Sequence, residues 1–183
     1  ATPAKGTYAL TNGTFITASV VSPLSYNGNI RQECTGWTLT GHTPASGTTP
    51  QMTFAITNDA TLSWHWKIAY RLNSLAGANG TVSPTGGWYF AGSTVAITAY
   101  PSAFYHFDSW SGDISDAGID GERLTVVIIA PRTVSAAFAP NLTATRGVPE
   151  YWLANHGWLT DFETAAETDS DNDGMPAWAE WRA

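Results

Sequence analysis

The sequence predicts a mostly β protein, built from two tandem small antiparallel β modules and a short α-helical tail. Charged residues are only 13% of the 183 residues, about half the usual share. Apolar residues alternate with small or hydroxyl residues in two similar stretches, as in half-buried strands. Helix signals occur only near the C-terminal end. We therefore expect module 1 at residues 1–67, module 2 at 68–139, a linker at 140–147 and the helical tail at 148–183.

The two modules share one strand pattern. Each reads as strand, tryptophan turn, strand, short turn and strand, and Trp37 of module 1 aligns with Trp110 of module 2. In the first strands, the apolar residues of the two copies fall on one another. The aligned pairs are Ile16 with Val95, Ala18 with Ile97 and Val20 with Ala99, and the later aligned ranges are 52–57 with 124–129 and 61–67 with 133–139.

Module 2 has an opening hairpin that module 1 lacks. It spans residues 70–84, and its Asn79-Gly80 pair is a strong hairpin signal. Module 1 has too few residues before its first strand to form both strands of such a hairpin. Its sheet is therefore expected to have an unpaired edge, which another chain or residues 1–6 could cover.

Residues 68–139 resemble a known family. The shared pieces are a G-T-V turn, a G-x-x-V-x-x-x-A strand, a W-S-G-D turn and a closing V-x-A-x-F strand. They resemble the divergent internalin B-repeat family, small β modules that occur in tandem on bacterial surface and secreted proteins. A weaker copy at 7–67 lacks the opening hairpin and has Thr38-Leu39 where Ser-Gly-Asp would fall. The resemblance implies a non-catalytic spacer, adhesive or assembly role.

An acidic stretch in the tail has a regular spacing. From residue 169, carboxylates fall at loop positions 1, 3, 5 and 12, with a glycine at position 6. This D-x-D-x-D-G-x5-E spacing is that of an EF-hand-like calcium loop, in which the carbonyl oxygen at position 7 is a further ligand. The predicted Ca²⁺ ligands are Asp169, Asp171, Asp173, Met175 and Glu180.

The alternative is a solvated acidic loop without an ion. Calcium is favoured because it offsets the repulsion among four carboxylates. Pro176 at position 8 has no N–H to pair with a second loop, so we expect a lone structural site. The segment also resembles the calcium loops of dockerins and thrombospondin type 3 repeats. Dockerins carry two such loops, whereas this sequence shows one, so the partner binding of dockerins is not implied for this chain.

Three short helices are expected in the tail. The first lies within 148–157. The second follows Thr160, which is expected to cap it with Glu163 three residues later. The third begins near Pro176.

The net charge of −7 lies in the tail. Residues 1–149 hold seven acids and seven bases, whereas 150–183 hold eight acids and one base. Without a basic patch, nucleic acid and anionic membranes are poor partners. The longest apolar run, 124–130, is too short to cross a bilayer, so no membrane insertion is expected.

No catalytic constellation is evident, and we expect no enzyme. The sequence has no G-x-S-x-G, no H-E-x-x-H and no phosphate-binding loop. The four histidines have no metal-ligand spacing. His65 is expected on the strand face opposite Trp64 and Trp66. Asp108 and Asp113 are expected to serve turn chemistry.

These features favour a non-catalytic extracellular or cell-surface bacterial protein. It would be a structural or adhesive module that self-associates, or joins neighbouring β modules, by strand addition at the module 1 edge, with Ca²⁺ stiffening the tail. The alternative is a carbohydrate-binding accessory module of a secreted polysaccharide-degrading enzyme, because tryptophans can stack on sugars, although tryptophans in a β sandwich are more often core. The candidate sugar-stacking residues are Trp64, Trp66, Trp88 and Trp110.

Overall fold

The computed structural model describes residues 1–183. Strands hold 46% of the residues and helices 9%, so the prediction of a mostly β chain with a short helical tail is confirmed. The chain forms two compact units, which are described separately. The first unit comprises 1–72, 87–93 and 127–132, and the second comprises 73–86, 94–126 and 133–183.

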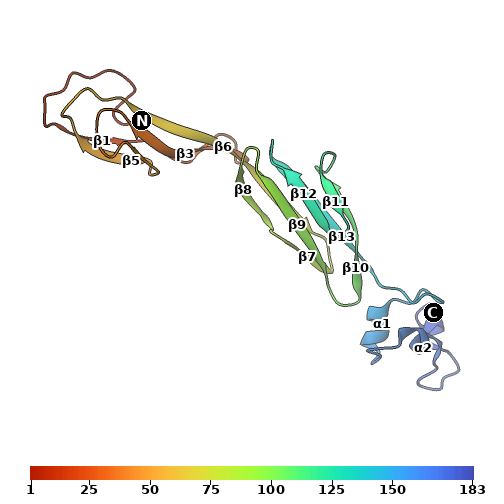
Figure 1. Cartoon of the computed structure of the whole chain (residues 1–183). Helices are drawn as coiled ribbons and strands as arrows, with labels where there is room; N and C mark the ends of the chain where they lie inside the picture. The colour runs from red at the N-terminus through yellow and green to blue at the C-terminus, as the bar shows by residue number, and fades with distance from the viewer. The chain divides into compact units, whose positions relative to one another are not determined.

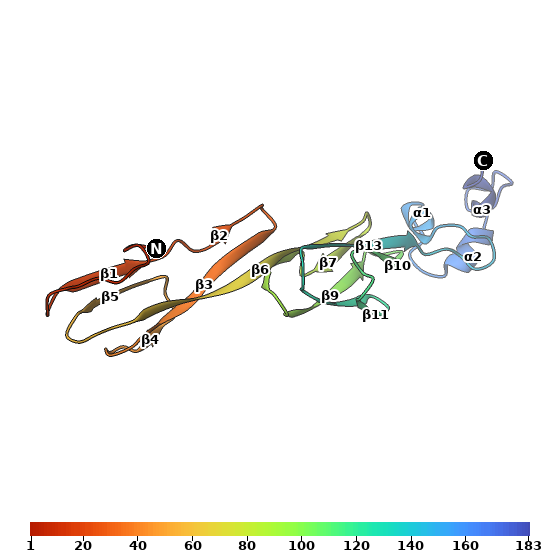
Figure 2. The ribbon, with the colours of Figure 1, turned by 90° about the horizontal axis from the view of Figure 1, so that it is seen from above.

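The first unit holds a two-stranded sheet and part of a larger antiparallel sheet. β1 pairs with β5, which places Ala18 opposite Met52. β3 pairs with β6, and β2 and β4 pair with β3 (Figure 2). Ala18, Trp37, Leu39 and Met52 form the core. The strands are β1 (Phe15–Ser19), β2 (Leu24–Ser25), β3 (Ile30–Leu39), β4 (Ser46–Gly47), β5 (Gln51–Ala55), β6 (Leu62–Ala76) and β8 (Gly86–Phe90).

The second unit holds a four-stranded sheet in the order β11-β12-β9-β7 (Figure 1). β13 is hydrogen-bonded to β10 on one side and to β6 on the other. Apolar residues such as Ile97, Leu124 and Val134 are fully buried. The strands are β7 (Gly80–Ser83), β9 (Thr94–Pro101), β10 (Tyr105–Gly112), β11 (Gly118–Asp120), β12 (Arg123–Val127) and β13 (Arg132–Pro140).

The pairing repeats as the sequence alignment predicts. β1 pairs with β5 as β9 pairs with β12, and β3 pairs with β6 as β10 pairs with β13. Each tryptophan strand also contains a register shift at the aligned place. The shift lies between Cys34 and Gly36 in β3 and between Phe107 and Ser109 in β10. The two copies therefore share strand pairing as well as residue pattern.

The predicted tryptophan turns are wrong. Trp37 lies inside β3 and Trp110 inside β10. In each strand the register shift just before the indole adds one residue, which bends the strand without ending it. The two indoles, only 5% and 7% exposed, remain in the core. Burial of the rings therefore outweighs the turn signal of the small residues around them.

The predicted hairpin over residues 70–84 is also wrong, because the strands on either side of Asn79-Gly80 do not pair with each other. Asn79 has a φ of 67°, which suits a tight turn. However, β6 and β7 on either side of the turn belong to different sheets. β7 pairs instead with β9, where Val82 lies opposite Ala99 and is buried. The turn therefore connects two sheets. β7 joins β9 and not β6, and this pairing buries Val82.

One antiparallel bridge joins the N-terminal segment to β1, the first strand of module 1. Thr2 and Ser19 exchange backbone hydrogen bonds of 2.8 and 2.7 Å. By the sequence alignment, Ser19 corresponds to Thr98, which pairs with Ser83 of β7. Thr2 therefore takes the place that Ser83 has in module 2.

β6 passes through the predicted module boundary. The strand runs without interruption from Leu62 to Ala76, so the boundary between residues 67 and 68 falls inside it. One strand contributes to both compact units.

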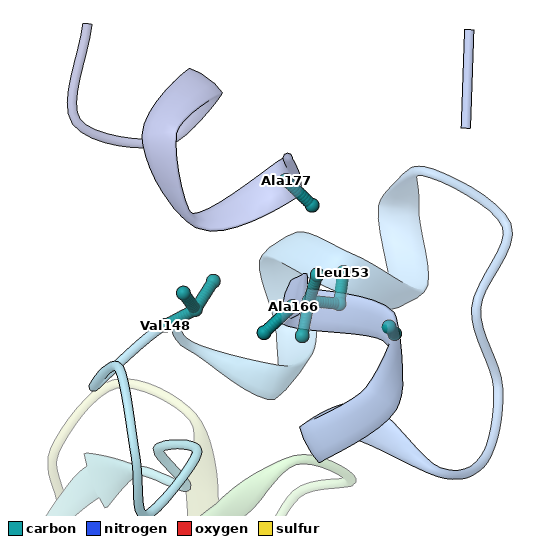
Figure 3. Packing of buried hydrophobic residues seen from close by; sticks show 5 residues of the cluster. Val148, Leu153, Ala166 and Ala177 are labelled. Carbon is teal, nitrogen blue, oxygen red and sulfur yellow. The ribbon is translucent and has the colours of Figure 1, made fainter. Parts of the chain in front are cut away.

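The tail contains three short helices: α1 (Glu150–Asn155), α2 (Phe162–Glu167) and α3 (Ala177–Glu180). Apolar residues of the tail pack into a small core of their own, as Figure 3 shows. Trp152, Trp158, Phe162 and Trp178 pack against it. The core residues are Val148, Leu153, Ala165, Ala166 and Ala177.

The predicted cap of the second helix is wrong. Asp161, with a φ of 53°, precedes α2, and no side chain caps the helix. The Glu163 carboxylate instead accepts hydrogen bonds from the N–H groups of Ala144 and Thr145. Glu163 thus holds the linker and is not available to close the capping box with Thr160.

Candidate functional site

The loop between α2 and α3 brings three carboxylates together. Ligand oxygens of Asp169, Asp171 and Asp173 all lie within 4.8 Å of one another. Asp169 is half-buried, and the other two are exposed. Glu180 is not in this cluster; it is the last residue of α3 and is half-buried. Met175 directly follows the turn and is 37% exposed.

Backbone N–H groups hold the carboxylates in place. Gly174 N–H donates to Asp169 Oδ2 at 3.0 Å, and Met175 N–H donates to Asp173 Oδ1 at 2.8 Å. Asp173 N–H donates to Asp171 Oδ1 at 3.2 Å. Gly174 has a φ of +94°, which residues with a Cβ adopt rarely. The sequence therefore curls the loop so that its acidic side chains converge.

The chemistry of this cluster fits a hard cation. Asp169 Oδ1 is buried and has no hydrogen-bond partner in the chain, and an unsatisfied buried carboxylate oxygen is unfavourable. A divalent cation would satisfy it, and a set of oxygen ligands suits Ca²⁺. Asp169, Asp171 and Asp173 could hold the ion. Binding itself and the contributions of Met175 and Glu180 stay predictions.

Arg146 of the linker contacts both sides of the loop. Its Nε and Nη2 donate to Glu167 Oε1 and Oε2 at 2.5 and 3.0 Å. Its guanidinium carbon lies 4.6 Å from the centroid of the Trp178 ring. The hydrogen bond between Arg146 and Glu167 raises the pKa of Arg146 and lowers the pKa of Glu167 from their ordinary values. Both groups are thereby kept charged.

A second arginine completes this contact. Arg182 Nη2 donates to the carbonyl oxygen of Arg146 at 3.1 Å. The linker is thus held by α2 on one side of the loop and by the end of the chain on the other. Sequence reasoning did not find this contact, because its partners are far apart in the chain and no local spacing joins them.

The tryptophans predicted to bind sugars occupy different environments. Trp110 is buried, and its Nε1 donates to Gly121 O at 3.2 Å. Trp64 packs against the core of the first unit. Trp88 is half-buried beneath Arg31, whose guanidinium carbon lies 4.3 Å from its ring centroid. Trp66 is half-buried opposite Cys34. Core packing or a cation–π contact thus engages three of these four rings.

Each histidine has a hydrogen-bond partner within the chain. His42 Nε2 accepts from the N–H of Thr57 at 3.0 Å, and His65 Nε2 lies 3.2 Å from the Thr38 hydroxyl. His65 is exposed, while its neighbours Trp64 and Trp66 are half-buried. Further along the chain, His106 Nδ1 lies 3.1 Å from Asn141 Oδ1, and His156 Nδ1 lies 2.8 Å from Trp152 O.

Asp113 accepts a hydrogen bond beside a turn, whereas Asp108 accepts one within β10. Asp113 Oδ2 accepts from the N–H of Thr133 at 2.8 Å. Asp108 Oδ2 accepts from the hydroxyl of Ser109 at 2.8 Å, beside the register shift in β10. Asp113, just beyond the end of β10, thus bonds the backbone of Thr133, whereas Asp108 lies inside β10 at the register shift.

Comparison with known proteins finds a family match for part of the chain. Residues 70–142 match the divergent InlB B-repeat domain. The matched range contains β7 through β13, and the match is compatible with a bacterial surface module. No curated protein and no solved structure matches the chain. The match confirms the family resemblance of module 2.

No helix in the structure has the length and apolar character needed to cross a membrane.

Proposed function

We propose that this chain is a non-catalytic structural or adhesive module of an extracellular bacterial surface protein. It self-associates, or joins neighbouring β modules, by strand addition at the edge of module 1, and Ca²⁺ stiffens its tail. The observation that carries the proposal is the match of residues 70–142 to the InlB B-repeat domain. The repeated strand pairing extends the same architecture to module 1.

A structural role suits the chemistry of the polar residues. The histidines and the paired acids around Trp110 bind neighbouring backbone or side-chain groups. Groups engaged in this way stabilise loops and strand ends. We therefore assign them no catalytic role.

The calcium loop is the second part of the proposal. Three converging carboxylates and the unpartnered Asp169 Oδ1 support it. When bound, the ion would supply positive charge that offsets the repulsion among the carboxylates. Arg146 would hold the helices on both sides of the loop in place, so that less conformational entropy is lost when the ion binds.

Imaging and glycan binding test this function. Negative-stain imaging of the concentrated chain in calcium is expected to show ordered assemblies, and a glycan array is expected to show no specific binding. Specific glycan binding by particles that stay single would contradict the proposal and favour the carbohydrate-binding alternative.

A further inference from the structure

The outer edge of β5 is covered differently in the two modules. In module 2, β11 pairs with β12 and places Gly118 opposite Thr125. The alignment puts Thr53 of β5 at the position of Thr125, and residues 46–47 at the start of β11. Those two residues form β4, which pairs with β3 instead of β5 (Figure 2). The strand that covers β12 in module 2 is therefore diverted in module 1, and β5 is an edge strand.

The diversion also affects the tryptophan at the aligned position. Trp110 donates its Nε1 hydrogen to Gly121 O, directly after β11. Trp37 Nε1 is buried and has no partner in the chain. A Cβ on Gly47 of β4 would lie 2.5 Å from the Trp37 ring. The packing of β4 on this ring holds β4 away from β5.

The hydrogen-bonding groups on the open edge follow from the ladder. Val20 N–H donates to Pro50 O at 2.9 Å at one end of the β1–β5 pair. Ile56 N–H donates to Thr14 O at 2.9 Å at the other end. Alternate residues of an antiparallel strand point their backbone groups to opposite edges. The groups that point away from β1 are those of Gln51, Thr53 and Ala55.

Gln51 and Thr53 of this edge are exposed, and the next outward N–H beyond Ala55, that of Thr57, donates to His42 Nε2. A groove of about 660 Å³ runs beside Thr53–Ala55, bordered by the loops at Gly41–Thr43 and Thr57–Asn58. Natural edge strands are usually protected by charges, prolines or bulges. β5, with the sequence QMTFA, has no charged residue and no proline, and its pairing with β1 shows no register shift. The strand therefore presents a regular, uncharged ladder.

We propose that β5 pairs antiparallel with β5 of a second copy of this chain, about a two-fold axis at Thr53. Each Thr53 N–H then meets the carbonyl oxygen of the other Thr53. Gln51 and Ala55 pair with Ala55 and Gln51 of the second copy. Gln51 O already accepts from the Thr49 hydroxyl at 2.6 Å, and a carbonyl oxygen has a second lone pair. The register thus satisfies every outward backbone group of the strand.

Three features favour a second copy over another peptide. The outward groups are symmetric about Thr53, as a two-fold interface requires. The strand is uncharged, so two copies meet without like-charge repulsion. The pairing places Met52 beside Phe54 of the second copy, and it makes a four-stranded sheet, the number found in the corresponding sheet of module 2. The inference rests on the proposed self-association but places it at β5, across the sheet from the β1 edge where the missing hairpin would lie and where Thr2 forms a bridge.

Proline substitution tests the register with a matched control. Thr17 and Thr53 are opposite one another in the β1–β5 pair, and their hydroxyls share one hydrogen bond of 2.9 Å. Both backbone N–H groups point away from the partner strand, so Thr53→Pro blocks the proposed edge and Thr17→Pro blocks the opposite edge. Each substitution removes the same hydrogen bond between the two threonine hydroxyls. Sedimentation velocity from micromolar to millimolar concentration, with circular dichroism of each variant, is the measurement.

We expect the wild-type chain and Thr17→Pro to form dimers as concentration rises, and Thr53→Pro to stay monomeric. If either proline variant is unfolded, Thr53→Cys in the Cys34→Ser chain is compared with Thr17→Cys in the same chain, and a short bismaleimide is expected to crosslink only the former. A monomeric wild type, or crosslinking through Thr17→Cys alone, overturns the inference. Ordered assemblies that persist in Thr53→Pro would overturn it while leaving the proposed function in place.

Discussion

The ring of Tyr105 on β10 stacks on the ring of Tyr151 on α1, with centroids 5.6 Å apart and planes 8° from parallel. Nearby, Asn141 Nδ2 donates to Glu150 Oε2 at 3.0 Å. These contacts join the β strands of the second unit to its helical tail. Order in the tail is therefore linked to β10 and to the residue that follows β13.

Tyr151→Ala is expected to loosen the tail. A stacked aromatic pair contributes about 1 kcal/mol beyond the area it buries, so proteolysis within 148–183 should become faster. Tyr100→Ala is the control, because Tyr100 lies on β9 and is 52% exposed. Equal proteolysis rates in the two variants would contradict a role for the stack.

Calcium removal is expected to loosen the tail while leaving the β units folded. Asp171→Asn and Asp173→Asn should each weaken calcium binding by about tenfold or more, since affinity depends on the number of charged ligands. Isothermal titration calorimetry measures the binding, and proteolysis with and without chelator measures the order of the tail. Asp59→Asn, in an exposed loop, is the control. Unchanged proteolysis with chelator would rule out a structural ion.

Arg146→Lys is expected to weaken calcium binding several-fold, although Arg146 is not a predicted ligand. Lysine keeps the charge but loses the two-point hydrogen bond to Glu167 and the flat stacking on Trp178. Tryptophan fluorescence during a calcium titration reports the change. Arg123→Lys, at an exposed position on β12, should titrate as wild type. An Arg146→Lys titration that matches wild type would show that the contact does not pre-organise the loop.

Trp110→Phe is expected to cost about 1 kcal/mol more than Trp37→Phe, because it removes a hydrogen bond as well as ring volume. Trp110 Nε1 has Gly121 O as its partner, whereas Trp37 Nε1 has none in the chain. Chemical denaturation of the two variants gives the comparison. A larger loss for Trp37→Phe would mean that its indole N–H is satisfied in solution.

Gly36→Ala is expected to destabilise the first unit by about 2 kcal/mol more than Gly13→Ala. Both glycines have positive φ, +139° and +86°, so both variants carry backbone strain. At Gly36 a Cβ would also lie 2.2 Å from Gly47 O, whereas nothing lies within 4 Å of one at Gly13. Thermal unfolding measures the difference. Equal losses of stability in the two variants would show that β4 shifts easily to make room for the added Cβ.

Alternation and internal alignment predicted much of the β architecture. Ala18 and Ile97 align in the sequence, and both are buried in corresponding strands. Alternation reports which face of a strand is buried, but it does not report which sheet the strand joins. For that reason the pairing across Asn79-Gly80 was mispredicted. The same limit hid the diversion of β4, which depends on a small residue, Gly47, fitting against Trp37.

The candidate metal ligands were predictable only where their spacing is local. Asp169, Asp171 and Asp173 converge because alternate positions of one tight loop place them together. Glu180 lies on the short helix α3, whose orientation depends on packing in the tail core. Glu163 shows the same effect, because its carboxylate binds the linker at Ala144. Such tertiary contacts leave no periodic signal in the sequence.

The unbroken run of β6 from Leu62 to Ala76 has a bearing on how such chains evolve. Recombination between 67 and 68 would split one strand between two parental genes, and each half would need a compatible partner to complete its ladder. Viable exchange should therefore favour crossover points in the turns on either side of β6. Recombinant chains would then carry the whole strand, with β6 and its ladder intact.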